Sequence, residues 1–319
     1  MEKEQKQGRV DFAKLLKGEL GLVLILAALC IVFAILSPHF LSAKNLLNIT
    51  RQVAVVLIIA IGMLCVVLTG EIDLSVGSSA ALAGVACAWM LIQTNSQLIS
   101  ILFALLVGVG VGVFNGYLSV YQKIPSFIVT LASMEIFRGC VLLWTNGKSM
   151  SGLPKGFSLW GANYIFGIIP VSTIISLSLI VLGFVVIHKT KHGIYLKAIG
   201  ANGEAAVLST IPLKRYKMLA FIMNGCLCAI GGIITTSKLL SAQPTACEGM
   251  EMDVLSAVIL GGAALSGGIG TISGTLIGAL IIGVINNGMN LIGVTPFLQQ
   301  VVKGLIILAA VLIKRNKKE

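Results

Sequence analysis

The stretch VAVVLIIAIGMLCVVLT, residues 53–69, decides the class of fold. It holds no charged side chain, and a helix of about 20 mostly apolar residues crosses the roughly 30 Å hydrocarbon layer of a membrane. Comparable apolar runs lie at 20–36, 76–92, 98–120, 124–144, 165–187, 218–236, 271–289 and 297–313. The sequence therefore predicts an all-α, polytopic membrane bundle.

Composition points to the same class. Of the 319 residues, 57% are hydrophobic and 11% are charged, whereas a soluble domain carries about 25% charged residues. This balance disfavours a soluble enzyme and a disordered chain. It also disfavours a nucleic-acid binder, although the formal net charge is +11.

A tenth apolar run, 254–265, is too short to span a membrane alone. The segment LSGGIG that begins at Leu265 should end its helix. Irregular backbone at membrane depth is tolerated only where protein covers it or where it lines a cavity. We therefore expect about ten transmembrane helices, some of them broken or re-entrant.

The positions of Lys and Arg predict the orientation. With the N-terminus inside, the inner segments carry about three times as many of these residues as the outer ones, as the positive-inside rule requires. Both termini are then cytoplasmic. The predicted organisation is a tail at 1–19, one transmembrane domain at 20–313 and a second tail at 314–319.

The longest cytoplasmic connection, 188–217, predicts a short helix. Asn202 suits an N-cap, Glu204 suits the positive end of a helix, and Pro212 ends the segment. A helix of about two turns is marginal alone, so it must dock on something. It either lies against the bundle or lipid surface, or it inserts into a cytoplasmic partner and transmits force.

No pattern in the sequence predicts catalysis. HExxH and GxSxG patterns do not occur, and the Gly-Lys-Ser at 147–149 lacks the preceding glycine of a P-loop. The chain is therefore expected to be no enzyme, with no catalytic, cofactor or metal site. It would move a solute passively, use an ion gradient, or depend on a separate ATPase.

Several long stretches, in the same order along the chain, resemble the permeases of ribose-type ABC importers. They are Leu46–Ile49, Thr69–Ser78, Gly193–Ala206, Ser241–Ala246, Gly261–Gly270 and Asn286–Val294. The chain departs from that family at Glu71 and Thr210, where the family usually has glycine, and at Cys247-Glu248, where it usually has a small pair. These departures bear on the identity of the substrate.

The resemblance implies a set of partners in a bacterial inner (plasma) membrane. Two copies of the permease would form the pathway for a monosaccharide, ribose or a similar sugar. A cytoplasmic ABC ATPase would bind ATP and Mg, and an extracytoplasmic sugar-binding protein would deliver the sugar. The coupling helix would be Asn202–Ser209, and the coupling residues would be Gly200, Asn202, Glu204, Ala205, Ala206 and Ser209.

Two pairs of polar residues have more than one interpretation. Asp73 or Ser75 could cap the helix that begins near Gly77, or could contact the substrate or act as a gate. Glu135 and Arg138 share a face of one span. Because isolated charges at mid-membrane cost about 2.5–3.5 kcal/mol even on the mildest scale, an intramembrane ion pair is favoured over contact with sugar.

The asparagines complete the candidate pathway or gate residues. Asn115 lies in the span 98–120, and Asn286, Asn287 and Asn290 crowd one later span. Amides bind sugar hydroxyls well, but they also hold membrane helices together. Both roles stay open for these residues.

An ion-coupled secondary transporter is the alternative function. It requires an intramembrane carboxylate that can take up a proton or sodium, and only Glu135 and Asp73 qualify. Within the favoured class, a purine nucleoside or a branched-chain amino acid remains a conceivable cargo.

Overall fold

The computed structural model describes residues 19–315, without the side chains of 307 and 309–315. Most of the two predicted tails lies outside the described residues. The longer helices are α2 (Glu19–Leu36), α3 (Ala43–Leu68), α4 (Val76–Thr94), α5 (Gln97–Gly116), α6 (Ser126–Thr145), α7 (Val171–Phe184), α10 (Leu213–Leu239), α12 (Ile272–Leu291) and α13 (Pro296–Arg315). The shorter helices are α8 (Lys191–Ala201), α9 (Gly203–Leu208) and α11 (Met250–Leu260).

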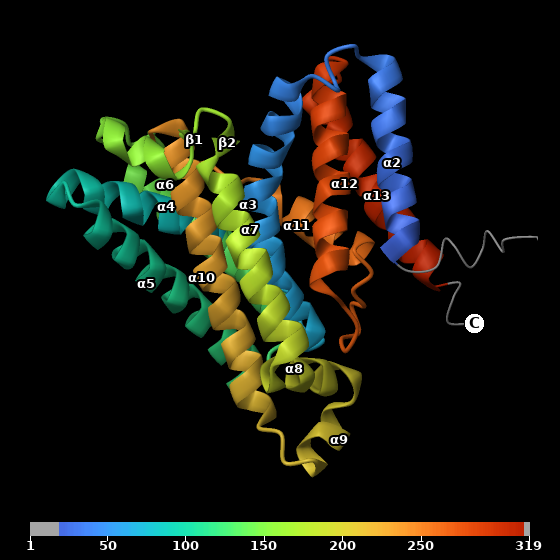
Figure 1. The fold of residues 1–319 in the computed structure, drawn as a ribbon. Helices are drawn as coiled ribbons and strands as arrows, with labels where there is room; N and C mark the ends of the chain where they lie inside the picture. Colours follow the sequence, from blue (N-terminus) through green and yellow to red (C-terminus); the bar gives the residue numbers. More distant parts are fainter. Residues whose placement is uncertain (1–18, 316–319) are drawn as a thin grey trace, which may run out of the picture.

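Short irregular elements complete the chain. One-turn π-helical segments extend α5 through Tyr117–Tyr121 and α7 through Val185–Lys189, and a 3₁₀ helix covers Lys155–Trp160. The strands β1 (Tyr164–Ile165) and β2 (Ile169–Pro170) pair antiparallel in a small hairpin. The helices stand roughly side by side in one elongated bundle (Figure 1).

The helices confirm the predicted all-α membrane bundle. Every predicted apolar run lies within a helix or includes most of one, and eight helices of the described chain are long and apolar enough to cross a membrane. The run at 254–265 forms only α11, which ends at Leu260. The following residues, 261–271, are not helical, so the predicted break is present but begins at Gly261 rather than after Leu265.

Two long helices, α3 and α10, form the centre of the bundle. Ile58, Met63 and Leu64 of α3 are completely buried, and α10 packs against α3, α4 and α5. Small residues allow the close approach of α10 and α5, because a β-carbon at Gly225 would overlap the Gly108 carbonyl oxygen. A glycine also allows α12 to approach α11 closely, because Gly278 lies against the Ala257 carbonyl oxygen.

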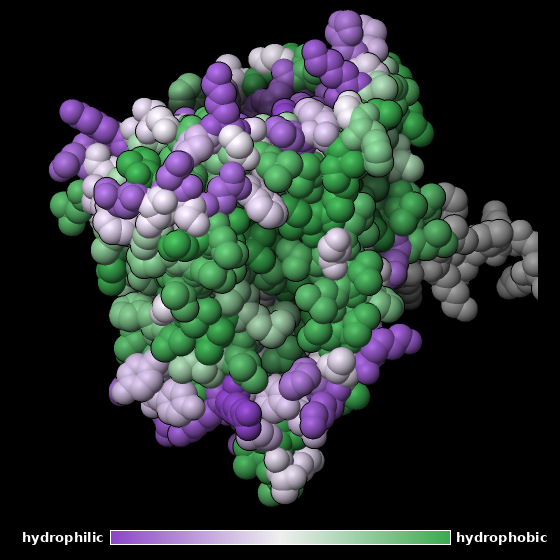
Figure 2. Space-filling view, turned by 60° about the vertical axis from the view of Figure 1, so that its left-hand side comes forward, coloured by the Kyte–Doolittle hydropathy of each residue, from purple (hydrophilic) through white to green (hydrophobic). Residues whose placement is uncertain are grey.

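The surface of the bundle is arranged as a membrane protein requires. Figure 2 shows a broad apolar belt between two rims rich in hydrophilic side chains. Helix α8 and the small helix α9 lie at one end of the belt, while the turn between α2 and α3 lies at the other (Figure 1). These two ends are called the α9 end and the opposite end below.

Candidate functional site

The α9 end is built by local capping signals. Thr190 precedes α8 and its hydroxyl accepts a hydrogen bond from the His192 N–H at 3.2 Å. Asn202 separates α8 from α9, and its Oδ1 accepts a hydrogen bond from the Ala205 N–H at 3.0 Å. The predicted N-cap and the predicted short helix are therefore confirmed, with α9 covering Gly203–Leu208.

Helix α9 projects away from the bundle. It is the outermost helix at its end in Figure 1, and Leu208 is 86% and Val207 58% exposed there, while Ala206 faces the core. Large apolar side chains exposed beyond a polar rim are typical of a surface that contacts another protein. Of the two predicted roles for this helix, the geometry favours docking into a partner.

Helix α8 connects α9 to the membrane helices. Leu196 and Ile199 are buried, and Gly200 packs so closely that a β-carbon there would overlap the Leu68 carbonyl oxygen at the end of α3. The same carbonyl accepts a hydrogen bond from the Gly268 N–H at 3.0 Å. Gly200 thus lies where α8, the end of α3 and the 261–271 turn meet.

The two departures from glycine, Glu71 and Thr210, also lie near this end. The Glu71 carboxylate forms an ion pair with Lys217 of α10, which ties the α3–α4 connection to α10. Thr210 follows α9 with a φ of 61°, a conformation that is a genuine outlier for a β-branched residue.

Thr210→Gly is expected to stabilise the end of α9. The left-handed backbone costs an L-residue about 1–2 kcal/mol, and glycine avoids this cost. Hydrogen exchange of the amides at 203–211 should slow by up to about fivefold, since the net gain is about 1 kcal/mol after the extra freedom of glycine in the unfolded chain. Thr210→Ala is the control and should give no such protection. Faster exchange in the glycine variant would contradict the assignment of strain.

A buried polar network lies within the bundle, between the α3–α4 connection and the helices α5, α6 and α10. Asp73 Oδ1 accepts hydrogen bonds from the N–H and the hydroxyl of Ser75 at 2.9 and 2.6 Å, and Asp73 Oδ2 accepts one from Asn224 Nδ2 at 2.9 Å. Asn115 Nδ2 donates to Ser75 Oγ at 2.8 Å, and Ser133 Oγ donates to Asn115 Oδ1 at 2.6 Å. All five side chains are at most 3% exposed.

This network brings together Asp73, Ser75 and Asn115, three of the candidate pathway residues. It differs from a simple helix cap. Ser75 occupies the N-cap position of α4, yet its side chain accepts no hydrogen bond from a backbone N–H of the first turn, and its hydroxyl lies 3.2 Å from the Ser79 hydroxyl instead. Asp73 instead fixes Ser75 itself, because one carboxylate oxygen accepts both of its donors. A gating role for the three residues stays a prediction.

The predicted ion pair between Glu135 and Arg138 is wrong for this structure. Arg138 Nη1 donates instead to the carbonyl oxygens of Pro244 and Ala246, at 2.6 and 3.0 Å. Among the described residues, the ion pairs are Lys217–Glu71 and Lys303–Asp253. These two backbone carbonyls accept hydrogen bonds from the guanidinium, so Arg138 does not need a carboxylate as its partner. Glu135 is exposed on the face of α6 that points away from the bundle.

The three asparagines of α12 contact other helices. Asn287 and Asn45 of α3 exchange two amide hydrogen bonds of 2.9 Å. Asn286 Nδ2 donates to Asp253 Oδ2 at 3.2 Å, and Asn290 Oδ1 accepts from Gln299 Nε2 at 2.8 Å. These bonds favour the structural role, and a pathway role for the three stays a prediction.

Four of these partners carry no motif that predicts their role. Asn45, Asn224, Asp253 and Lys303 are polar or charged residues within or beside apolar helices, and that contrast was the available signal. Lys303 Nζ lies 2.8 Å from Asp253 Oδ1. This ion pair joins the short helix α11 to α13.

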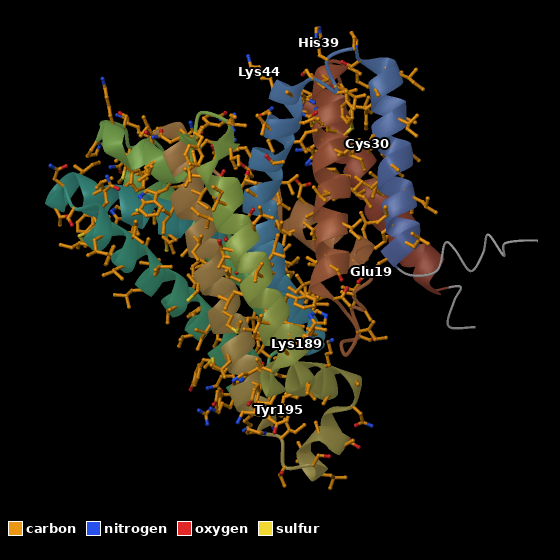
Figure 3. The ribbon with its side chains drawn as sticks, in the orientation of Figure 1. Glu19, Cys30, His39, Lys44, Lys189 and Tyr195 are labelled. Atoms are coloured by element: carbon orange, nitrogen blue, oxygen red, sulfur yellow. The ribbon has the colours of Figure 1, made fainter. Side chains whose placement is uncertain are left out.

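The opposite end carries a basic pocket of about 450 Å³ between the α2–α3 turn, the start of α3 and the β-hairpin. Its lining residues include His39, Lys44, Arg51 and Tyr164, and His39 and Lys44 stand at the far end from Lys189 and Tyr195 in Figure 3. Arg51 Nη1 donates to the Tyr164 hydroxyl at 3.3 Å. Within residues 19–315 no group of three His, Cys, Asp or Glu side chains is arranged to hold a metal ion.

Comparison with known proteins gives consistent matches. Residues 45–311 match the family described as branched-chain amino acid transport system / permease component. The ribose import permease protein of Bacillus subtilis (strain 168) is 45% identical over 316 residues, which are 98% of each chain. That of Escherichia coli (strain K12) is 39% identical over 318 residues, again 98% of each chain.

A relative with a different sugar in its name is similar as well. The L-arabinose transport system permease protein of Escherichia coli (strain K12) is 38% identical over 299 residues, which are 94% of this chain and 91% of that one. No solved structure matches the chain.

Proposed function

The chain belongs to the family of branched-chain-type ABC transport permeases, and from this premise we propose that it is the membrane subunit of an ATP-driven importer for a monosaccharide. The observation that carries the proposal is the α9 end. There a short helix with an exposed apolar tip at Leu208 is joined through Gly200 to the end of α3.

The geometry suggests how force from a partner would reach the pathway. An ABC ATPase that holds α9 would move α8 with it, because α8 and α9 are joined by a single residue, Asn202. The Gly200 contact would pass that movement to α3 and to the 261–271 turn. Two states of the bundle would alternate as the ATPase binds and hydrolyses ATP with Mg, so the chain itself needs no cofactor.

The remaining partners follow from the same class of importer. Two copies of the chain would enclose the pathway in the bacterial inner membrane, with both termini and α9 on the cytoplasmic side. Six lysines and arginines of the segment 188–217 at the α9 end fit that orientation. The basic pocket with Lys44 and Arg51 would then face outward, where acidic groups of a sugar-binding protein can dock.

The cargo is proposed to be ribose or a similar sugar. The relatives that share 39–45% identity over 98% of the chain are named for ribose, and one at 38% is named for arabinose. A neutral sugar is recognised by hydroxyl and amide groups rather than by a strong charge pair. An importer must also release its cargo, so weak binding in the pathway is sufficient.

Uptake in sealed vesicles tests this function. The permease, its ATPase and the sugar-binding protein are reconstituted together, and labelled ribose uptake is measured with ATP on the α9 side. Uptake should require ATP and the binding protein, and it should persist when an ionophore removes ion gradients. Uptake by the permease alone, driven by a proton or sodium gradient, would instead establish the secondary transporter.

A further inference from the structure

Glu135 occupies an unusual position. It lies at the middle of α6, roughly 14 Å from either end at a rise of 1.5 Å per residue. Its side chain is exposed, as are those of Ile128, Leu131 and Leu142 above and below it on the same face. The opposite face of α6 is buried in the bundle through Ser133 and Phe137.

The Glu135 carboxylate does not suit contact with lipid, although its apolar neighbours on this face would. A carboxylate at the centre of the hydrocarbon layer is costly and rare, and such groups almost always face a protein interior or a water-filled cavity. Glu135 has no hydrogen bond or ion pair with the described residues, since Arg138 is engaged by Pro244 and Ala246. The carboxylate therefore requires water or a polar ligand in front of it.

A connection with exposed polar side chains packs against α6 close to Glu135. The Arg138 contacts hold the connection 241–249, which leads from α10 to α11, against α6 one turn from Glu135. Thr245 and Glu248 of that connection are exposed. In contrast, the exposed face of α5 is apolar at the same depth, with Leu102 and Leu106 exposed there, as contact with lipid requires.

We propose that the Glu135 face of α6 lines the translocation pathway and that the Glu135 carboxylate accepts hydrogen bonds from sugar hydroxyls. Glu135 is then a specificity-determining residue for neutral polyhydroxylated solutes. A carboxylate offers about four acceptor sites, which match vicinal hydroxyls, and its negative charge disfavours anionic sugars. This inference rests on the proposed function and names the ligand contact within it.

Cysteine accessibility tests the position of this face. Glu135→Cys and Leu106→Cys are placed in a chain with Cys140→Ser, because Cys140 is exposed. Leu106 lies nine residues from the Gln97 end of α5, Glu135 lies ten residues from the Thr145 end of α6, and both are exposed, so Leu106 is a matched control. In the complete importer turning over ATP, a charged, membrane-impermeant thiol reagent should modify position 135 and leave position 106 unmodified.

Uptake then tests the ligand contact. Glu135→Leu should reduce ribose uptake by about tenfold, the value of one hydrogen bond to a charged group, whereas Glu135→Gln, which keeps an acceptor, should stay within about threefold. The amount of inserted permease and its association with the ATPase are measured for each variant.

The outcomes separate the two proposals. Failure to modify position 135, or equal modification of both cysteines, would overturn the pathway assignment. Unchanged uptake by Glu135→Leu would overturn the ligand contact. Either result can occur while uptake by the unsubstituted importer still depends on ATP and the binding protein, in which case the proposed function stands.

Discussion

Gly200→Ala is expected to reduce ribose uptake by about tenfold or more, because overpacking of a tight contact costs about 1–3 kcal/mol. The added β-carbon would overlap the Leu68 carbonyl oxygen and would approach the Gly268 N–H within 2.5 Å. Both are backbone groups that cannot rotate away. Helix α8 must therefore shift away from the end of α3. A movement of α9 would then no longer be transmitted through the Gly200 contact to α3.

Gly203→Ala is the matched control. Gly203 begins α9 on the other side of Asn202, and a β-carbon there would meet only Leu213 Cδ1 at 3.4 Å, which is an ordinary contact. This variant should transport sugar at the normal rate. The comparison separates a specific effect of the α8–α3 contact from a general effect of substituting glycine in this segment.

The experiment also distinguishes force transmission from assembly. ATPase association, measured by co-purification, should be intact in Gly200→Ala because the exposed tip of α9 at Val207 and Leu208 is unchanged. ATP hydrolysis should continue with little uptake. Normal uptake by Gly200→Ala would show that the path from α9 to the pathway does not run through this contact.

Local features of this molecule could be predicted from the sequence, because their causes lie within a few residues. The membrane helices follow from apolar runs such as 53–69, and α9 follows from an N-cap at Asn202 with Pro212 after it. The short α11 ends at Leu260, immediately before Gly261 and Gly262, which is five residues earlier than the break predicted after Leu265. In each case the residues that begin or end the helix lie next to it in the sequence.

Contacts between distant segments were not predictable in the same way. Glu135 lies three positions from Arg138, so a local ion pair was the simplest expectation, but Arg138 finds its acceptors 106 and 108 residues away. Asn45 and Asn287 are 242 residues apart, and only their helices' packing brings their amides together. An apolar run indicates that a helix crosses the membrane, but it does not indicate which turn of that helix contacts which neighbouring helix.

The same limit applies to the polar network. Asp73 and Ser75 are two residues apart beside a helix start, and this spacing predicts a local role for both. Asn224 is a single amide in the middle of the apolar run 218–236, and no pattern there predicts its partner. Its amide donates to Asp73 across 151 positions of sequence, so the partner of the carboxylate became known only from the fold.

Asp73→Ala is expected to destabilise the permease by about 3 kcal/mol or more, since each buried donor left without an acceptor costs about 1–3 kcal/mol. Three donors lose the carboxylate: the Ser75 N–H and Asn224 Nδ2 are left without an acceptor, whereas the Ser75 hydroxyl can turn to Ser79 Oγ, 3.2 Å away. Asp73 is 3% exposed and Asn224 is completely buried, so water does not readily replace the carboxylate.

The measurement is the free energy of unfolding of the detergent-solubilised permease during titration with sodium dodecyl sulfate. Ser133→Ala, at the outer edge of the same network, is the milder comparison and should cost about 1 kcal/mol, because it removes one hydrogen bond to Asn115. Asn224→Ala combined with Asp73→Ala should cost less than the sum of the single changes, by about 1 kcal/mol.

These values decide between the two roles that the sequence left open for Asp73. A structural network predicts a loss of stability that is coupled to Asn224, with uptake falling only as far as folded permease is lost. If Asp73→Ala is as stable as the unsubstituted chain and yet fails to transport, the carboxylate serves as a gate or a substrate contact. Because Asp73 Oδ1 accepts both donors of Ser75 at the start of α4, we expect the first result.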